Sequence, residues 1–597
     1  MPIEFINDDH FGRIYPPEPG NTMMLKEFSG SEAVNEISVF KLSGETKKPV
    51  DLDKFIGKGI RVELQTGENK FRHFHQIIFS ARDLGRTGAN AEDEAYGYEF
   101  ELRPWIWAAS RAEASRIFHK KSLEQILRTT FEVVTKFDGC KLEFSVRKPP
   151  PVLEYTVQFN ETNLNFALRL MEEFGLNYHC RMEKSGHTIV ISDNVDAFDD
   201  VDGKERAHFG AEVLGDKQEF FSTWLPQRNF TTGKTRTLDY NFEEKSSKVS
   251  SESTSSKSYA ASDQESFHYD GRIKEKSVGD DLAKRRLDSM RMGDSQVRCS
   301  GSLPSLGAGM KVKIVGAVPA SENGTFACLS ANHHYVHGAS LSNNASDNSY
   351  DGAYMLTRED APIAPKKVTP AAVMLGPQTA IVTTGAHDAV DKYGRIKVRF
   401  HWQSDTEDSM YCRVSQMWAG SGWGAVFIPQ TGMEVIVEFL GGQPDRPIIT
   451  GCVYNATNMP PWDLPGNKKI SGIKTVAKNQ ISFDDTGGSE LIEMIGTKDM
   501  KVDIKKDTNT TIGKDQTLEV TGDVKETVTG SITIESKKSI ILKVQDSKIE
   551  IGPASIKISS LSIEVSAQVS MVTKGGATAE HSAGGQMTVK GAIVMIN

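Results

Sequence analysis

The first half of the chain shows the hydrophobic spacing of β-strands more often than that of helices. Apolar and polar residues tend to alternate over 61–79 and 96–107, as in strands with one buried face. Helical spacing is confined to short stretches, and we predict helices at 122–134, 161–174 and 280–291. These patterns predict a mainly β region that short helices interrupt.

The stretch 243–264 breaks this pattern, because Ser, Lys and Glu dominate it and little of it can be buried. We predict a mobile surface loop there. Pro362, Pro365 and Pro370 then mark a linker. Residues 380–455 carry five short β runs separated by turn residues, a number that suits a small barrel of the OB type. We place this barrel domain at 376–462, after a base that spans 1–370.

The composition changes sharply in the last part of the chain, since 486–597 contain no Phe, Tyr or Trp. Large aromatic side chains supply much of an ordinary core. Here β-branched and small residues alternate with polar ones, most strictly in the run Leu561, Ile563, Val565, Ala567, Val569 and Met571. An earlier eight-residue period aligns Ile504, Ile512, Val520 and Val528, with Gly522 and Gly530 each two positions after a valine.

One copy of such a tail has difficulty folding alone, because its narrow apolar face and its strand edges lack partners. Three copies wound about one axis solve both problems. We therefore predict a trimeric needle at 483–597, an intertwined triple-stranded β-helix of β-prism shape, joined to the barrel by a linker at 463–482. A single-chain β-solenoid is the alternative. The predicted needle core consists of Ile512, Val520, Val528, Leu561, Ile563, Val565 and Val569.

Alternation continues to the far end of the sequence, where Met587, Val589, Ile593 and Met595 occupy every second or fourth position. No polar capping segment follows them in the sequence. An apolar prism end with open strand edges is expected to bind a separate cap. The predicted cap-docking tip is Gly591, Ala592, Ile593, Val594, Met595, Ile596 and Asn597.

Composition and charge narrow the possible partners. The net charge is −9, which argues against nucleic acid as a partner. The six cysteines are scattered without a zinc-ligand spacing, and we expect them to be reduced. The N-terminus lacks a signal peptide, and no apolar run reaches the roughly 20 residues of a membrane span. We therefore expect synthesis in the cytoplasm, with any export by a route that accepts the folded protein.

No enzymatic, cofactor or metal site is predicted from motifs. The run Gly233-Lys234-Thr235 resembles the end of a phosphate-binding loop, but the first glycine of that motif is absent. The histidines 333, 334 and 337 fall in a predicted strand that places 333 and 337 on one face and 334 on the other, and we expect a structural role. Trp418 and Trp423 could stack on sugars or bases, although packing within the barrel region is favoured.

The barrel region carries the motifs 414–420 (VSQMWAG), Trp423-Gly424, 429–435, 439–447 (FLGGQPDRP) and 451–455, and 483–486 lead into the needle. These motifs resemble those of the VgrG family, the valine-glycine-repeat spikes of bacterial type VI secretion systems. The residues of the barrel motif are Trp418, Gly420, Trp423, Gly424, Gly432, Asp445, Arg446 and Pro447. Gln403 and Gln430 depart from the usual family pattern, as does the Ser-rich stretch from 243.

The resemblance implies a homotrimer made of two hub-like β-barrel domains, an OB-fold neck and the needle. It further implies docking on an Hcp tube hexamer, contact with a baseplate, a PAAR-repeat tip protein, and effector cargo with its adaptor or chaperone. The spike would be secreted without a signal peptide and meet a target membrane transiently, delivering cargo rather than acting as an enzyme. The alternatives are a spike of a phage tail or of an extracellular contractile injection particle, and a cell-wall hydrolase.

Overall fold

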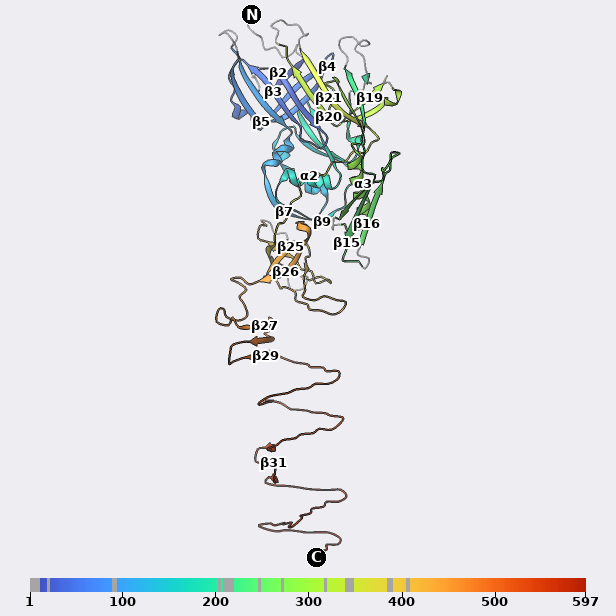
Figure 1. Ribbon diagram of the computed structural model, residues 1–597. Helices are drawn as coiled ribbons and strands as arrows, with labels where there is room; N and C mark the ends of the chain where they lie inside the picture. Colours follow the sequence, from blue (N-terminus) through green and yellow to red (C-terminus); the bar gives the residue numbers. More distant parts are fainter. Residues whose placement is uncertain are drawn as a thin grey trace. The chain divides into compact units, whose positions relative to one another are not determined.

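The protein is described here by a computed structural model of residues 11–18, 22–87, 94–201, 206–207, 219–244, 248–269, 273–315, 319–338, 348–383, 390–403 and 408–596. The chain divides into two compact units (Figure 1). The first unit comprises 1–474 and 482–493, and the second comprises 475–481 and 494–597. In the described part of the chain, no helix is both long and apolar enough to cross a membrane.

The largest sheet of the first unit has the strand order β1-β4-β5-β6-β3-β2-β20-β21-β18-β14. Strands β2, β3, β5, β20 and β21 of this sheet are labelled in Figure 1. Strand β19 adds to β20, and the short strands β12 and β13 pair with β19. Two apolar cores lie on this sheet, one among β1–β6 and one among β14 and β18–β21. The strands are β1 (Gly12–Tyr15), β2 (Met23–Ala33), β3 (Val39–Thr46), β4 (Gly59–Gly67), β5 (Lys70–Arg86), β6 (Tyr96–Arg103), β12 (Asp199–Asp200), β13 (Arg206–Ala207), β14 (Phe220–Arg228), β18 (Ser295–Ser302), β19 (Met310–Val315), β20 (Gly324–Val336) and β21 (Ser349–Arg358).

Two short helices and two small sheets form a third core. Ser122 caps α1 (Leu123–Thr130) in a reciprocal capping box with Gln125, and Thr162 caps α2 (Asn163–Glu173). The predicted helix at 161–174 is confirmed, whereas the one at 122–134 ends at Thr130 and gives way to a short 3₁₀ turn. The strands are β7 (Glu113–Lys121) paired with β9 (Leu153–Thr162), and β10 (Asn177–Glu183), β11 (Gly186–Ser192) and β8 (Lys141–Ser145) in that order.

Seven residues of the Ser-rich stretch form a strand, and this corrects part of the predicted loop at 243–264. Strand β16 (Lys248–Thr254) pairs antiparallel with β15 (Lys234–Tyr240) over seven residues, and β17 (Glu265–Tyr269) pairs with the other edge of β15. An edge strand needs few apolar residues, which explains the misleading composition. Helix α3 (Lys276–Arg291) packs on this sheet and begins four residues before the predicted start. Residues 245–247 lie outside the described residues.

The barrel domain holds five strands in the order β23-β22-β25-β26-β24. They are β22 (Gln378–Val382), β23 (Val398–Phe400), β24 (Arg413–Val414), β25 (Glu434–Phe439) and β26 (Pro447–Val453). Its core also includes Ile117 of β7 and Tyr155 and Val157 of β9. The barrel therefore completes its core with side chains of the preceding domain.

The tail repeats a regular zigzag (Figure 1). Bends or turns recur at 505–506, 513–514, 521–522, 529–530, 537–538, 545–546 and 553–554, a spacing of eight residues. The strands of this part are β27 (Ile470–Lys474), β28 (Gln480–Asp484) and β29 (Leu491–Ile495) in one sheet, and β30 (Ile540–Val544), β31 (Ser547–Ile551) and β32 (Ile556–Ser559) in another. Among the described residues, no buried apolar core includes a side chain of 494–596. In a single chain the tail thus has regularly spaced bends but no hydrophobic core.

Candidate oligomerisation and docking surfaces

The predicted needle-core residues are all exposed in the single chain. Val520 and Val528 each expose 45% of their surface, as does Ile512. Leu561 is wholly exposed and Val569 is 98% exposed, and Ile563 and Val565 are more than half exposed. Aliphatic residues at such regular spacing gain roughly 25 cal/mol per Å² when buried, so the tail has a strong drive to associate.

The repeat glycines lie where the backbone bends. Gly522 and Gly530 fall in the bends at 521–522 and 529–530. A Cβ atom at either position would meet nothing within 4 Å in the single chain. Contacts within a single chain therefore do not explain why glycine occupies these two bends.

The predicted cap-docking residues from Gly591 to Ile596 are exposed, and Asn597 lies outside the described residues. Ile593, Met595 and Ile596 each expose more than 80% of their surface. Five of the six described residues carry aliphatic or methionine side chains, and all six are exposed. These residues therefore present an apolar surface in the single chain.

The two barrel-motif tryptophans form an ordered but exposed loop. Their rings meet edge to face with centroids 4.7 Å apart, while Trp418 exposes 64% and Trp423 56% of their surface. The Gly420 N–H donates to the Trp423 carbonyl at 2.9 Å, and the Ala425 N–H donates to the Trp418 carbonyl at 3.0 Å. Each of these rings is therefore only partly covered within one chain.

The glycines of this loop are required by its geometry. A Cβ atom on Gly420 would lie 2.3 Å from the Trp423 ring. Gly424 has a φ of +141°, and its Cβ would lie 2.4 Å from the Trp418 carbonyl oxygen. Gln416 fixes the base of the loop, since its side chain both donates to and accepts from the Phe427 backbone. A rigid loop that exposes two tryptophans has the character of a protein interface.

The remaining motif residues shape the barrel's turns and its joint with the preceding domain. Asp445 Oδ1 accepts a hydrogen bond from the Val157 N–H of β9 at 2.7 Å. Gly432 sits in a turn with a φ of +85°, a backbone conformation that favours glycine. The Leu440 N–H donates to the Arg446 carbonyl at 3.0 Å, just before Pro447 begins β26 as a buried residue.

A second joint holds the barrel to the first part of the unit, and no sequence pattern marks it. Arg395 Nη1 lies 2.9 Å from Glu243 Oε1, and Lys274 Nζ lies 3.2 Å from the same oxygen. Arg395 also pairs with Asp391 at 2.6 Å. Burial opposes ionisation of Glu243, but Lys274 and Arg395 outweigh it and lower the pKa of that carboxyl. No motif could reveal the pair, because its members lie about 150 residues apart.

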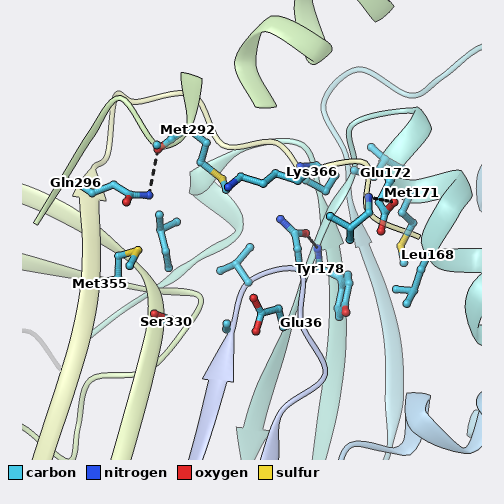
Figure 2. A pocket seen from close by; sticks show the side chains of 18 of the residues that line it. Glu36, Leu168, Met171, Glu172, Tyr178, Met292, Gln296, Ser330, Met355 and Lys366 are labelled. Atoms are coloured by element: carbon cyan, nitrogen blue, oxygen red, sulfur yellow. Dashed lines mark hydrogen bonds between the residues drawn. The ribbon is translucent and has the colours of Figure 1, made fainter. Parts of the chain in front are cut away.

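A cavity of about 500 Å³ lies where the linker after β21 crosses the first unit (Figure 2). Leu168, Met171, Met292 and Met355 give it a largely apolar lining. The linker is held beside it, since Glu172 Oε2 accepts the Val368 and Thr369 N–H groups at 2.9 and 2.8 Å. The tethered linker thus forms part of the wall of this cavity.

The histidine run of β20 has the predicted facing, with His333 buried and His334 exposed. His333 Nε2 lies 2.9 Å from Glu32 Oε1, and its Nδ1 lies 2.6 Å from the Tyr350 hydroxyl. Arg72 completes the cluster through a close ion pair with Glu32. Burial acts against the Glu32 charge, yet Arg72 and His333 lower the pKa of that carboxyl overall. Both nitrogens of His333 are therefore engaged in a structural network.

Another buried cluster, which no sequence motif marks, joins His75, Cys140 and His187. The two histidine Nδ1 atoms are 3.1 Å apart, and Cys140 Sγ lies 3.6 Å from His187 Nδ1. The Trp105 N–H donates to His187 Nε2 at 2.9 Å, so the neutral ring carries its proton on Nδ1, where a metal would have to bind. Burial lowers the pKa of His75 to about 4 and raises that of Cys140 to about 11. A neutral hydrogen-bonded cluster explains this geometry without a metal.

The Gly233-Lys234-Thr235 run does not form a phosphate-binding loop. Lys234 begins β15 and pairs with Glu252 and Glu265, while the Thr235 hydroxyl donates to the Ala283 carbonyl at 2.6 Å. A Cβ atom on Gly233 would collide with the Ser262 carbonyl oxygen. These residues hold a sheet to a helix.

Three family profiles match consecutive parts of the chain. Residues 31–339 match the phage tail baseplate hub family, and 378–454 match the type VI secretion system/phage-baseplate injector OB domain. Residues 470–573 match the bacteriophage T4 gp5 C-terminal trimerisation domain. Hub, OB barrel and trimerisation tail in this order define a tail-hub-and-spike protein.

Relatives identify the family within that class. Two spike proteins of Pseudomonas aeruginosa are similar: VgrG1b at 30% identity over 85% of this chain and 69% of its own, and VgrG1a at 28% identity over 96% and 94%. The Escherichia coli c3393 protein, a type VI secretion component similar to T4 tail proteins gp27 and gp5, shares the fold with a TM-score of 0.53 and 15% identity. That match covers 74% of this chain and 100% of that one. The chain belongs to the VgrG family of type VI secretion system spike proteins.

Proposed function

We propose that three copies of this chain form the spike and work mechanically, as a carrier and a puncturing device rather than as an enzyme. The observation that carries this proposal is the tail, whose regularly spaced aliphatic residues are exposed in one chain and lie in a matched trimerisation domain. We also propose the domain division 1–370, 376–462 and 483–597, which is supported by the change from buried aromatic side chains in the first two parts to exposed aliphatic ones in the third.

The base would dock on the Hcp tube within the baseplate. Each chain carries two apolar cores on its large sheet, so a trimer would present six such lobes in a ring. A pseudo-sixfold ring fits the symmetry of a hexameric tube. The Trp418–Trp423 loop would pack against a neighbouring copy in the neck, because it is rigid and apolar yet exposed in one chain.

The tip would take a PAAR-repeat cap on residues 591–597, and effector cargo with its adaptor would ride on the assembled spike. Support for the cap comes from the exposed apolar end of the tail. The loaded spike would be secreted from the cell. A phage-tail or extracellular injection spike would use the same architecture in another machine.

Light scattering of the purified chain tests the proposal, with an expected mass of three times 65.8 kDa. Electron micrographs should show elongated particles, and a stable monomer would contradict the proposal. For the tip, Ile593→Asp with Met595→Asp should abolish capture of a PAAR-repeat protein while the trimer persists. Lys590→Asp, at a neighbouring polar position, is the matched control.

A further inference from the structure

One segment of the tail pairs its strands within the chain, unlike the residues on either side. Strands β30 and β31 pair antiparallel, with Leu542 opposite Ile549, and β31 pairs with β32, with Ile549 opposite Ile558. Across residues 501–538 and 560–596, all of them described, no strand pairs with another strand of the chain. We call the three-stranded sheet at 540–559 the clasp sheet.

The clasp sheet has one largely aliphatic face. Residues opposite each other in an antiparallel pair point to the same side, and alternate residues of a strand do likewise. This rule puts seven aliphatic side chains on one face, broken only by Ser547: Ile540, Leu542, Val544, Ile549, Ile551, Ile556 and Ile558. Most of these side chains are exposed, with Leu542 at 60% and Ile556 at 68%.

The opposite face of the clasp sheet is mostly polar, and two of its charged residues form an ion pair. It carries Lys543, Lys548, Glu550 and Lys557, and Lys548 Nζ lies 2.7 Å from Glu550 Oε2. Ile541 is the aliphatic residue on this side, opposite Glu550. The sheet therefore has one face suited to water and one suited to a protein partner.

The sequence explains why the bend at 521–522 does not fold back in this way. Around the bend at Thr521–Gly522, Val520 precedes the bend by one residue and Val524 follows it by two. In a two-residue hairpin these residues would point to opposite faces, so the aliphatic surface would be split. At the bend 545–546 the following aliphatic residue comes three positions later, at Ile549, and falls on the same face as Leu542.

We propose that the partners of the clasp sheet are the other two copies of this chain, which meet it face to face rather than by sharing strands. The segment lies inside the matched trimerisation domain, whose neighbouring octads leave their edges for other copies to pair. Three preformed sheets can dock without threading one chain around another. The clasp sheet thus sets the register of the trimer, and the interwound parts extend from it.

This inference rests on the proposed homotrimer and is tested by disulfide trapping in the folded protein. The variant pair Lys543→Cys and Lys548→Cys places thiols at directly opposite positions, which in such pairs are about 4.5–5.5 Å apart between Cα atoms. A Cys452→Ser background removes the exposed native cysteine. Oxidation should consume both new thiols and leave every chain at the monomer position on a non-reducing denaturing gel.

The matched control pair is Glu519→Cys with Val524→Cys, at the same offsets from the bend at 521–522. It should give no bond within a chain. Links between chains at 543 and 548, unreacted thiols there, or an equal bond within the chain for the control pair would each overturn the inference. A wild-type monomer in light scattering would instead overturn the trimer itself.

A second pair of variants tests the face. Ile549→Lys puts a charge on the aliphatic face and should cause loss of the trimer, whereas Ile541→Lys puts it on the polar face and should leave the trimer intact. Equal trimer content for the two variants would contradict face-to-face docking.

Discussion

The large sheet and the tail use the same alternation of apolar and polar residues but stabilise it in different ways. In the first unit, aromatic side chains such as Phe28, Phe40 and Phe74 meet within 5–6 Å of one another and are fully buried in one chain. In the tail no aromatic residue follows 485, and the aliphatic side chains stay exposed. Alternation therefore predicts a strand, whereas residue size predicts whether one chain can complete the core.

The comparison separates two kinds of stability within one protein. The free energy of unfolding of the first unit should not depend on protein concentration. The tail, in contrast, should be folded only when the other copies are bound. All seven tryptophans precede 486, so tryptophan fluorescence reports on the first unit, which includes the barrel, but not on the tail beyond 485.

The largest effect should come from charges in the tail. Val520→Asp with Val528→Asp would bury two unpaired carboxylates in each of three chains, and we expect complete loss of the trimer. The fluorescence unfolding curve of the first unit should stay close to the wild type. Light scattering and fluorescence measured on the same sample would check both parts.

Glu519→Asp with Glu526→Asp provides the control for that variant, because it changes polar positions of the same repeats. Loss of the trimer in the control, or unfolding of the first unit in the test variant, would mean that the two regions are not energetically separate.

The next effect concerns the buried ion pair of the large sheet. Arg72→Met leaves the Glu32 carboxylate buried without its cation, and we expect a loss of about 3–5 kcal/mol in the free energy of unfolding. Denaturant unfolding followed by tryptophan fluorescence measures it. Arg82→Met, which removes an exposed pair with Glu99, should change this energy by less than about 0.5 kcal/mol. The trimer should persist in both variants, and its loss on Arg72→Met would contradict the separation.

The sequence predicted regular features well and long-range ones poorly. The octad, the helix after Thr162 and the facing of His333 all follow local periods, and the structure confirms them. The joints of Glu243 with Arg395 and of Asp445 with Val157 unite residues far apart in the chain, so no local pattern reveals them. The Ser-rich strand β16 was mistaken for a loop because an edge strand can be held by backbone pairing alone.

A moderate effect should appear as pH dependence of the first unit. The pKa of His75 is about 4 in the folded chain against 6.5 for the free side chain, so the unfolded chain binds protons more readily. The neutral, buried His75 ring therefore contributes to the free energy of unfolding, and this contribution is complete above pH 6.5. It is lost as the pH falls from 6.5 toward 4, by up to roughly 3 kcal/mol.

The variant His75→Asn should therefore show a shallower fall in unfolding free energy between pH 6.5 and 4.5 than the wild type does. His334→Asn changes an exposed histidine of the same unit and should leave the wild-type slope intact. Identical slopes for His75→Asn and the wild type would show that burial of this ring does not govern the acid response.

The smallest effect should come from the joint between the barrel and β9. Asp445→Ala removes the acceptor of the Val157 N–H, a bond across two domains of the first unit, and should cost about 1–2 kcal/mol. Asp445→Asn keeps an acceptor oxygen and should cost less, while Asp499→Ala in the exposed tail should cost nothing measurable in tryptophan fluorescence.

Because Ile117, Tyr155 and Val157 lie in the barrel core, a loosened joint should lower the stability of the barrel and the base together in one transition. Two separate transitions in Asp445→Ala would show that this hydrogen bond, rather than the shared apolar core, couples them.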